Sequence, residues 1–468
     1  ADDTAGLDVN SIASTSALAV RTYTGDSTAP ILVGFDLNVD TSKLVVSFSE
    51  TVLMGAINIG SFSLQSASAA GAGVQAYQLT GGNVAQTSAT KLTFTLLKSD
   101  VDAIKLLTSL ATNRGNTYMF FASTAASDRS SNAITAILSS NAIQATAFVE
   151  DLTKPTLTAF DFDMDQGLLT MSFNEPIAHS SVDVTQIHIQ SVVNSAATEY
   201  ALSGGVVGAT DGAVIRVTLT VTDVDGIKLI AGLGKTSAST FRTVTSTGMT
   251  DMIGLQVNAI ASSSALAVTG YQADITKPTL GSASLNMNTG SFVLSFSEPI
   301  DASSLDVTKI SILDQTTNSF SFTDSATTSN NGRIITVTLS TNDLNDLKLD
   351  DNLATSNGDS YFAAQADAIF DLAAVANGLA AKSAFAPASF TADTTKPNLL
   401  SFAVDMAAST LTLNFDEPVR ASTLVASAVT LQGTQAADPA TTWVLTGGST
   451  ASANGLQLVL SLVVFDTT

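Results

Sequence analysis

The chain has 468 residues, of which 41 are acidic and 19 are basic, so its formal net charge is −22. Such an acidic chain is repelled by nucleic acid and by anionic membranes, which excludes them as partners. Cysteine is absent, which excludes disulfides, thiolate metal sites and cysteine nucleophiles. No apolar run is long enough for a membrane span. At about 150 residues per domain, the length predicts three or four domains.

Four copies of one phrase divide the chain. The copy from Asp151 reads DLTKPTLTAFDFDMDQGLLTMSFNEPI, and each copy runs from an aspartate to a glutamate 24 residues further on. The aspartates are Asp26, Asp151, Asp274 and Asp393, and the glutamates are Glu50, Glu175, Glu298 and Glu417. Successive copies are 125, 123 and 119 residues apart. This period is too long for a solenoid and predicts one small domain per copy.

Within each copy the apolar residues alternate with polar ones. In the second copy, residues 156–163 predict a strand, residues 165–167 a hairpin turn, and the alternation of Leu169, Met171 and Phe173 a second strand. Further strands are expected at 186–191, 213–220, 240–246 and 265–271, and a short helix at 224–230 with Asp223 as its N-cap. About seven strands in a unit of about 120 residues are typical of a β-sandwich.

The motifs DxTxPxL and LxLxFSEPV resemble the bacterial immunoglobulin-like (Big-type) repeats of adhesins and S-layer proteins, and similar repeats of algal surface proteins. The resemblance covers essentially the whole chain, although the first copy has Ala29 for lysine and Thr51 for proline. It implies an all-β fold of tandem immunoglobulin-like β-sandwich domains in an elongated rod. It also implies an extracellular or cell-surface location.

The copies predict five segments. Residues 26–150, 151–273 and 274–392 form repeats 1 to 3, and residues 393–468 form an incomplete repeat 4. Residues 1–25 match the end of a repeat, because VNSIASTSALAV from Val9 matches VNAIASSSALAV from Val257. Two explanations stay open. Either the chain is a window on a longer array, or residues 1–25 of one subunit donate a strand to the last domain of its neighbour, and both give a head-to-tail filament.

Repeated acids at the domain joints are candidate metal ligands. In an immunoglobulin-like topology the linker aspartate, the glutamate and a third series of aspartates share one pole, and calcium prefers such oxygen ligands. The candidates are Asp3, Asp26, Glu50, Asp128, Asp151, Glu175, Asp251, Asp274, Glu298, Asp371, Asp393 and Glu417. Two alternatives stay open: the acids cap turns, or the linker lysines Lys154, Lys277 and Lys396 form isopeptide bonds as in some pilins.

We expect a structural protein and no enzyme. His179 and His188 have no counterparts in the other copies, and no Ser/His/Asp arrangement or phosphate-binding loop recurs. The sequence therefore predicts the subunit of an extracellular filament or rod. The alternative is an adhesin stalk or a module that binds a glycan or a receptor.

One further spacing recurs in the first three copies. A lysine stands five residues after an aspartate, in the pairs Asp100–Lys105, Asp223–Lys228 and Asp343–Lys348.

Overall fold

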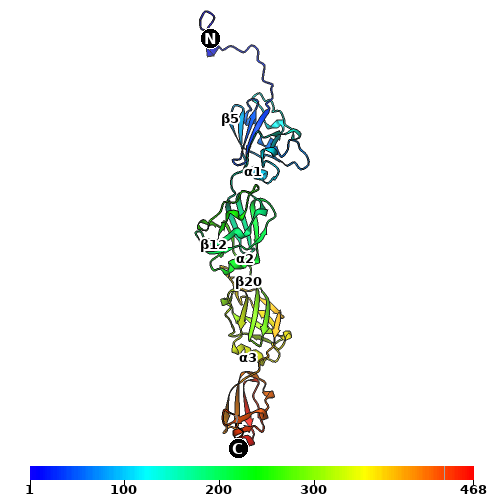
Figure 1. Ribbon diagram of the computed structural model, residues 1–468, viewed down its shortest axis with the longest axis vertical. Coiled ribbons are helices and arrows are strands. Elements are labelled where there is room, and N and C mark those ends of the chain that lie inside the picture. Colours follow the sequence, from blue (N-terminus) through cyan, green and yellow to red (C-terminus); the bar gives the residue numbers. More distant parts are fainter. Residues whose placement is uncertain (437, 468) are drawn as a thin grey trace.

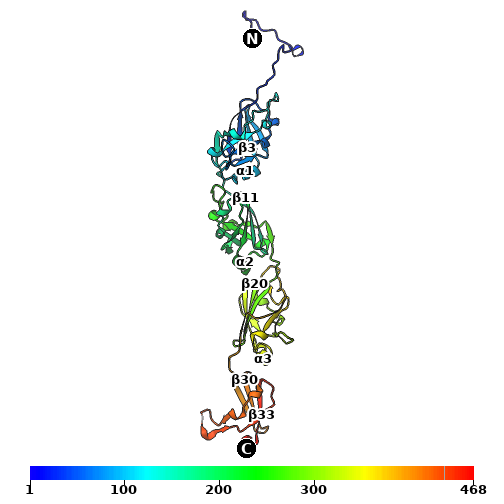
Figure 2. The ribbon, with the colours of Figure 1, turned by 90° about the vertical axis from the view of Figure 1, so that its right-hand side faces the viewer.

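The computed structural model describes residues 1–436 and 438–467; Thr468, the expected end of repeat 4, lies outside the described residues. Four β-rich bodies follow one another along a single long axis (Figures 1 and 2). Helices α1, α2 and α3 each lie at the boundary between one body and the next. The described residues are all-β apart from these helices, a fourth short helix near the end of the chain and scattered 3-10 turns, which confirms the predicted all-β class.

The first body contains two sheets and one helix, α1 (Lys98–Lys105). The larger sheet has the strand order β5-β6-β2-β1-β9, and the smaller sheet has the order β4-β3-β7-β8. The larger sheet comprises β1 (Leu32–Asn38), β2 (Lys43–Phe48), β5 (Gly82–Ser88), β6 (Lys91–Leu96) and β9 (Ala147–Val149). The smaller sheet comprises β3 (Phe62–Gln65), β4 (Ala76–Gln78), β7 (Tyr118–Phe121) and β8 (Ile143–Gln144).

The second body repeats this plan with the orders β14-β15-β11-β10-β18 and β13-β12-β16-β17. The larger sheet comprises β10 (Leu157–Asp163), β11 (Leu168–Ile177), β14 (Gly205–Val207), β15 (Gly212–Leu219) and β18 (Gly270–Gln272). The smaller sheet comprises β12 (Ile187–Val192), β13 (Ser195–Ala201), β16 (Phe241–Val244) and β17 (Leu266–Ala267). Its helix is α2 (Val221–Leu229).

The third body has the orders β23-β24-β20-β19-β28 and β22-β21-β25-β27, with β26 paired to β20. The larger sheet comprises β19 (Leu280–Asn286), β20 (Ser291–Asp301), β23 (Ala326–Thr327), β24 (Gly332–Thr338), β26 (Phe370–Asp371) and β28 (Ser389–Thr391). The smaller sheet comprises β21 (Ile310–Leu313), β22 (Ser319–Ser321), β25 (Tyr361–Ala364) and β27 (Lys382–Phe385). Its helix is α3 (Thr341–Leu349).

The fourth body has one four-stranded sheet, β29-β30-β34-β33, and one pair, β31-β32. These strands are β29 (Leu399–Asp405), β30 (Thr410–Val419), β31 (Thr430–Gln432), β32 (Thr442–Val444), β33 (Gly448–Thr450) and β34 (Gly455–Leu462), and α4 (Val464–Thr467) follows. Every residue of β29 is exposed, whereas β10, its counterpart in the second body, buries Phe160 and Phe162. The edge strand β29 is therefore uncovered, although the neighbouring β30 buries Leu411 and Leu413.

Alternation of apolar side chains builds each core. In β2 the residues Leu44, Val46 and Phe48 are buried while their neighbours are half exposed, so one face of the strand points inward. Residues of both sheets meet in one apolar cluster, as Phe62 of β3 packs 5.3 Å, between ring centroids, from Phe94 of β6. Each of the first three bodies has such a cluster of its own, and the fourth has a smaller one.

The expected N-cap of the second helix is wrong. Helix α2 begins at Val221, and its N-cap is Thr220, whose side chain accepts a hydrogen bond from the backbone N–H of Asp223. Asp223 stands one turn inside the helix, where its carboxylate can reach a neighbouring loop instead of the helix terminus. The pattern located the helix correctly but misplaced its start by a few residues, as is common at helix ends.

Candidate functional site at the domain joints

The structure brings nine of the predicted acids into three groups. In each group the carboxylates offer oxygen atoms within 4.8 Å of one another. The groups are Asp26, Glu50 and Asp128; Asp151, Glu175 and Asp251; and Asp274, Glu298 and Asp371. The second and third groups are buried between two bodies, and the first lies at the outer pole of the first body. Acids more than 100 residues apart in sequence therefore meet at one pole.

The last three predicted acids are placed differently. Asp393 and Glu417 meet at the third joint without a third carboxylate among the described residues. Asp3 lies in the exposed N-terminal segment, where its carboxylate accepts hydrogen bonds from the backbone N–H groups of Ala5 and Leu7. Within one copy of the chain, Asp3 belongs to none of the joints.

Each linker aspartate makes the turn that its sequence indicates. Oδ1 of Asp151 accepts the backbone N–H of Thr153 at 3.3 Å, and the same contact recurs at Asp26, Asp274 and Asp393. The third acid of each group also closes its own turn, since Oδ1 of Asp251 accepts the N–H groups of Ile253 and Leu255. In Asp151, Asp274 and Asp393 the turn uses Oδ1 and leaves Oδ2 facing the joint. In Asp128 and Asp371 the second oxygen accepts a hydrogen bond from an asparagine side chain of the same turn.

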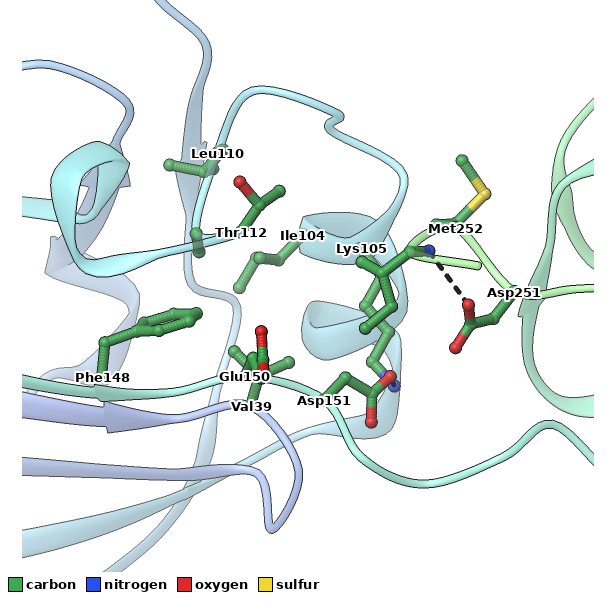
Figure 3. Close-up of a pocket in the computed structure, with 12 residues that line it drawn as sticks. Val39, Ile104, Lys105, Leu110, Thr112, Phe148, Glu150, Asp151, Asp251 and Met252 are labelled. Atoms are coloured by element: carbon green, nitrogen blue, oxygen red, sulfur yellow. Dashed lines mark hydrogen bonds and ion pairs between the residues drawn. The ribbon is translucent and has the colours of Figure 1, made fainter. Parts of the chain in front are cut away.

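A lysine from the preceding body reaches each of the three joints. Nζ of Lys105 lies 2.5 Å from Asp151 and 2.7 Å from Glu175 (Figure 3 shows Lys105 beside Asp151, with Asp251 nearby). Nζ of Lys228 lies 2.7 Å from Asp274 and 2.8 Å from Glu298. The third joint repeats the pattern, with Lys348 paired to Asp393 at 2.7 Å and to Glu417.

Buried aspartates position the helices that carry these lysines. Asp100 in α1 accepts hydrogen bonds from the hydroxyl of Tyr77 at 2.9 Å and from the N–H of Thr80 at 2.9 Å. Asp223 and Asp343 make equivalent contacts in the next two bodies, to Ser203 and Thr323 respectively. The helix is thereby pinned to a neighbouring loop. The lysine five residues further on then points out of the pole of its body.

A second contact ties the linker to the preceding body. Asp40, in the turn after β1, accepts hydrogen bonds from the N–H of Leu152 at 3.0 Å and from the hydroxyl of Thr153 at 2.8 Å. These bonds lower the pKa of Asp40. Equivalent hydrogen bonds hold the next two linkers, since Asp165 accepts from the N–H and hydroxyl of Thr276, and Asn288 from those of Thr394. Each joint is therefore fixed both by the lysine and by the linker.

The second joint has additional contacts. Arg333 of β24 pairs with Asp225 of α2, its Nη2 lying 2.8 Å from Oδ1. Nζ of Lys235 donates to the backbone oxygens of Lys228 and Leu372, both at 2.6 Å. Burial and the neighbouring Lys228 lower the pKa of Lys235 to about 8. This joint is the most tightly closed, with a cavity of about 10 Å³ against about 280 Å³ at the first joint and 330 Å³ at the third.

Negative charge exceeds positive charge inside the first joint. One ammonium, that of Lys105, faces the carboxylates of Asp151, Glu175 and Asp251. Oε1 of Glu175 and Oδ2 of Asp251 are buried and have no hydrogen-bond partner among the described residues. Burial raises the pKa of Glu175 to about 7, against the opposing effect of Lys105, and burial raises the pKa of Asp251 as well. A carboxyl in the joint is thus prone to hold a proton near neutral pH.

These pKa shifts predict stability that falls as pH rises. Burial raises the pKa of Glu175 and Glu298 to about 7 from 4.5, so the folded state binds more protons than the unfolded state between these values. Their contribution is complete below about pH 4.5 and is lost as pH rises through about 7. We expect a higher melting temperature near pH 5 than near pH 8. The variant Glu175→Gln with Glu298→Gln should flatten this slope, and an unchanged slope would contradict the assignment.

The lysines at the joints were missed by the sequence prediction. Lys154, Lys277 and Lys396, the linker lysines considered for isopeptide bonds, are exposed. The lysines that meet the acids come from the preceding helices, and their recurrence five residues after an aspartate was the available signal. Calcium at the acidic groups stays a prediction. The group at Asp26 is the one that no lysine of the described residues reaches.

No family model matches the sequence, and no curated protein matches it significantly. Two solved structures of the S-layer protein SbsC align with 92% and 91% of this chain at 10% and 8% identity, with TM-scores of 0.18 and 0.17. A marsupial T cell receptor aligns with 67% of this chain and 92% of its own at 9% identity and a TM-score of 0.13. The chain spans 62% and 63% of the SbsC structures. TM-scores this low carry no weight for fold or function.

The described helices are short. Among the helices in the described part of the chain, none is both long enough and apolar enough to cross a membrane. The longest of them, α2 and α3, have nine residues each, whereas a spanning helix needs about 20.

Proposed function

We propose that the chain is a structural rod of an extracellular surface, built from tandem β-sandwich domains whose joints are held stiff. The observation that carries this proposal is the lysine that ties each body to the next at all three joints. Flexibly linked domains need no such buried contact, since relative motion is their default. A rod that keeps its length transmits position and force, which suits a surface layer, a stalk or a filament.

We also propose that the rods associate head to tail. In the second body, β18 pairs in parallel with β10, and Phe162 stands opposite Tyr271. Phe162 corresponds to Val404, which is 242 residues later, and Tyr271 corresponds to Tyr23, which is 248 residues earlier. Val404 and Tyr23 are both exposed. The N-terminal segment of one copy therefore fits beside β29 of another copy, in the same register.

Exposed apolar side chains support this association. The N-terminal segment exposes Leu18 and Val20 at 80% and 72%, and β29 exposes Leu400 and Phe402 at 68% and 57%. Joining the two would bury apolar surface and would pair the open edge of β29, which otherwise is free to bind other strands. We propose that the segment that pairs with β29 comes from a second copy of this chain.

Cysteine pairs test the proposed register, because the chain has no native cysteine. Ala403 and Thr22 correspond to Asp161 and Gly270, which are direct partners. We expect the variant Thr22→Cys with Ala403→Cys to form a ladder of disulfide-linked oligomers on a non-reducing gel. The control is Thr22→Cys with Val404→Cys, one residue out of register, so that the second cysteine points to the opposite face.

Negative-stain microscopy provides a second test of the head-to-tail association. Extended polymers in negative stain, and their loss in Tyr23→Asp, are the expected results. Compact monomers without a cysteine ladder, both with calcium and with a chelator, would contradict the proposal.

The comparison of calcium with a chelator also tests whether the acidic groups bind calcium. Calcium bound at the acidic groups should stiffen the polymer and raise its melting temperature. If stiffness and melting temperature are the same with calcium and with the chelator, the acids serve only as turn caps and as partners of the lysines.

Binding of a glycan or receptor is a second candidate function. The observation that favours it is the cavity of about 280 Å³ at the first joint, whose lining includes Val39, Leu110 and Phe148 together with Lys105 and Glu150 (Figure 3). Apolar walls with a few charged groups are typical of ligand sites. The volume is at the lower end of such sites, and the same joint already serves to connect two bodies, so we favour the structural role.

A further inference from the structure

At the second joint, one amine touches two carboxyl groups in different ways. Nζ of Lys228 donates a hydrogen bond to Oε2 of Glu298 at 2.8 Å. It also lies 2.7 Å from Oδ2 of Asp274, yet this buried oxygen has no hydrogen-bond partner among the described residues. The amine is therefore held between two carboxyl groups, by a hydrogen bond to the glutamate and by an ion pair with the aspartate. The side chains of Lys228, Asp274 and Glu298 are only 9%, 5% and 8% exposed.

The other two joints repeat this arrangement. Lys105 donates to Glu175 at 2.7 Å, while its Nζ lies 2.5 Å from Asp151. Lys348 donates to Glu417, while its Nζ lies 2.7 Å from Asp393. In each case the lysine comes from the last turn of a helix, the aspartate opens the linker, and the glutamate belongs to the next body. The threefold recurrence separates this arrangement from a chance surface ion pair.

We propose that the lysine and the aspartate of each joint condense into an amide, so that isopeptide bonds Lys105–Asp151, Lys228–Asp274 and Lys348–Asp393 link successive bodies. The inference rests on the joints assigned to the proposed rod, but it does not depend on where the rod acts. The reacting lysines are those of the preceding helices, and not the linker lysines Lys154, Lys277 and Lys396 that the sequence suggested. The result is a rod whose joints are covalently closed.

The reaction balances without any added reagent. The ammonium of the lysine first passes one proton to the glutamate carboxylate, which its Nζ already contacts. The free amine then attacks Cγ of the aspartate, a C–N bond forms, and one C–O bond of the aspartate breaks. The departing oxygen leaves as water, carrying the proton returned by the glutamate and a second proton from the nitrogen. Ammonium and carboxylate become an amide and one water, and the glutamate ends as it began.

The surroundings suit this chemistry. Burial raises the pKa of Glu175 and Glu298 to about 7, which makes each glutamate able both to take and to return a proton near neutral pH. Fixed contact between the reacting groups replaces a bimolecular encounter by an intramolecular one. Burial lowers the pKa of Lys105 and of Lys228, but the two neighbouring carboxylates of each lysine raise it by more, so the net pKa shift is upward. The free amine is therefore scarce, and we expect the bonds to form slowly after folding.

Intact mass measurement of the purified chain tests the proposal directly. We expect a mass below that of the sequence by up to three water molecules, one for each joint, with the more exposed third joint closing last. Proteolysis should release a branched peptide that joins the Lys228 segment to the Asp274 segment. In the denatured chain, Lys105, Lys228 and Lys348 should resist an amine-acylating reagent that modifies Lys98. A chain at its full sequence mass, fresh and after prolonged incubation, would overturn the proposal.

Two variants locate the chemistry within the joint. Glu298→Gln removes the proton carrier of the second joint and should retain the mass of one water relative to wild type, after correction for the substitution. Glu150→Gln, an exposed glutamate of the first linker, is the matched control and should lose as much water as wild type. If Glu298→Gln also loses as much as wild type, the role of the glutamate is wrong. Extended rods at full sequence mass would refute the cross-links and leave the proposed function intact.

Discussion

Replacing Lys105 by methionine is expected to loosen the first joint and leave the rest of the rod unchanged. The substitution leaves Asp151, Glu175 and Asp251 together and buried, without their cation. Removing one partner of a buried ion pair typically costs about 3–5 kcal/mol. Whether Lys105 acts as an ammonium or as one half of an amide, its replacement removes the tie between the two bodies.

The effect should be visible in shape as well as in stability. We expect small-angle scattering of Lys105→Met to show a shorter mean length, and micrographs to show a kink between the first two bodies. Proteases should cleave residues 150–156 faster than in wild type. Adding Glu175→Gln and Asp251→Asn should recover part of the stability, because these changes remove the unpaired charges.

Lys98→Met is the matched control. Lys98 lies on the same helix, its side chain is 58% exposed, and it pairs with Asp102 one turn away. Exposed pairs of this kind contribute about 0–1 kcal/mol, so the control should behave as wild type. If Lys105→Met and Lys98→Met have equal effects, the lysine does not hold the joint, and the proposed rod loses its main support.

The sequence predicted much of each domain because the relevant signals are local. Alternation at Leu169, Met171 and Phe173 specified a half-buried strand, and the structure places all three in the core of β11. The error at Asp223 is local too. Thr220, Thr222 and Asp223 are all able to cap a helix, and Thr220, three positions before Asp223, is the N-cap. Such competition between neighbouring caps leaves little trace in a single sequence.

The joints were less predictable because they depend on how two domains face each other. Topology within a domain was sufficient to expect that Asp151, Glu175 and Asp251 share a pole. The position of Lys105 relative to that pole depends on the preceding domain and on the linker contact of Asp40. The repeated spacing of Lys105 after Asp100 was visible, but a recurrence alone does not say which partner a side chain meets.

Replacing Arg242 by methionine is expected to stabilise the second body. Arg242 in β16 is 0% exposed, and its Nε, Nη1 and Nη2 have no hydrogen-bond partner among the described residues. Burial lowers its pKa to about 9. The repeat register places Met119 and Phe362, both fully buried, at the equivalent positions of the first and third bodies. The arginine therefore stands where the other domains carry apolar core residues.

The size of the gain follows from the cost of burying an unpaired charge. Replacing buried charged groups by apolar residues of similar volume stabilises proteins by about 1–4 kcal/mol. Methionine is a better replacement than phenylalanine, because the core of the first body, which contains Met119, resembles that of the second. Leu44 of the first body corresponds to Leu169 of the second. Native-state hydrogen exchange of β12 and β16 in the full chain would measure this gain, with peptides of the third body as an internal reference.

Arg216→Met provides the control for this prediction. Arg216 lies on β15 of the same body and is exposed, so its replacement should change the free energy of unfolding by no more than about 0.5 kcal/mol. A gain at Arg242 with none at Arg216 would show that burial of the guanidinium, and not its charge alone, lowers the stability of this body. A loss at Arg242 would mean that the guanidinium makes a stabilising contact in solution, and that the second body differs from its neighbours at its core.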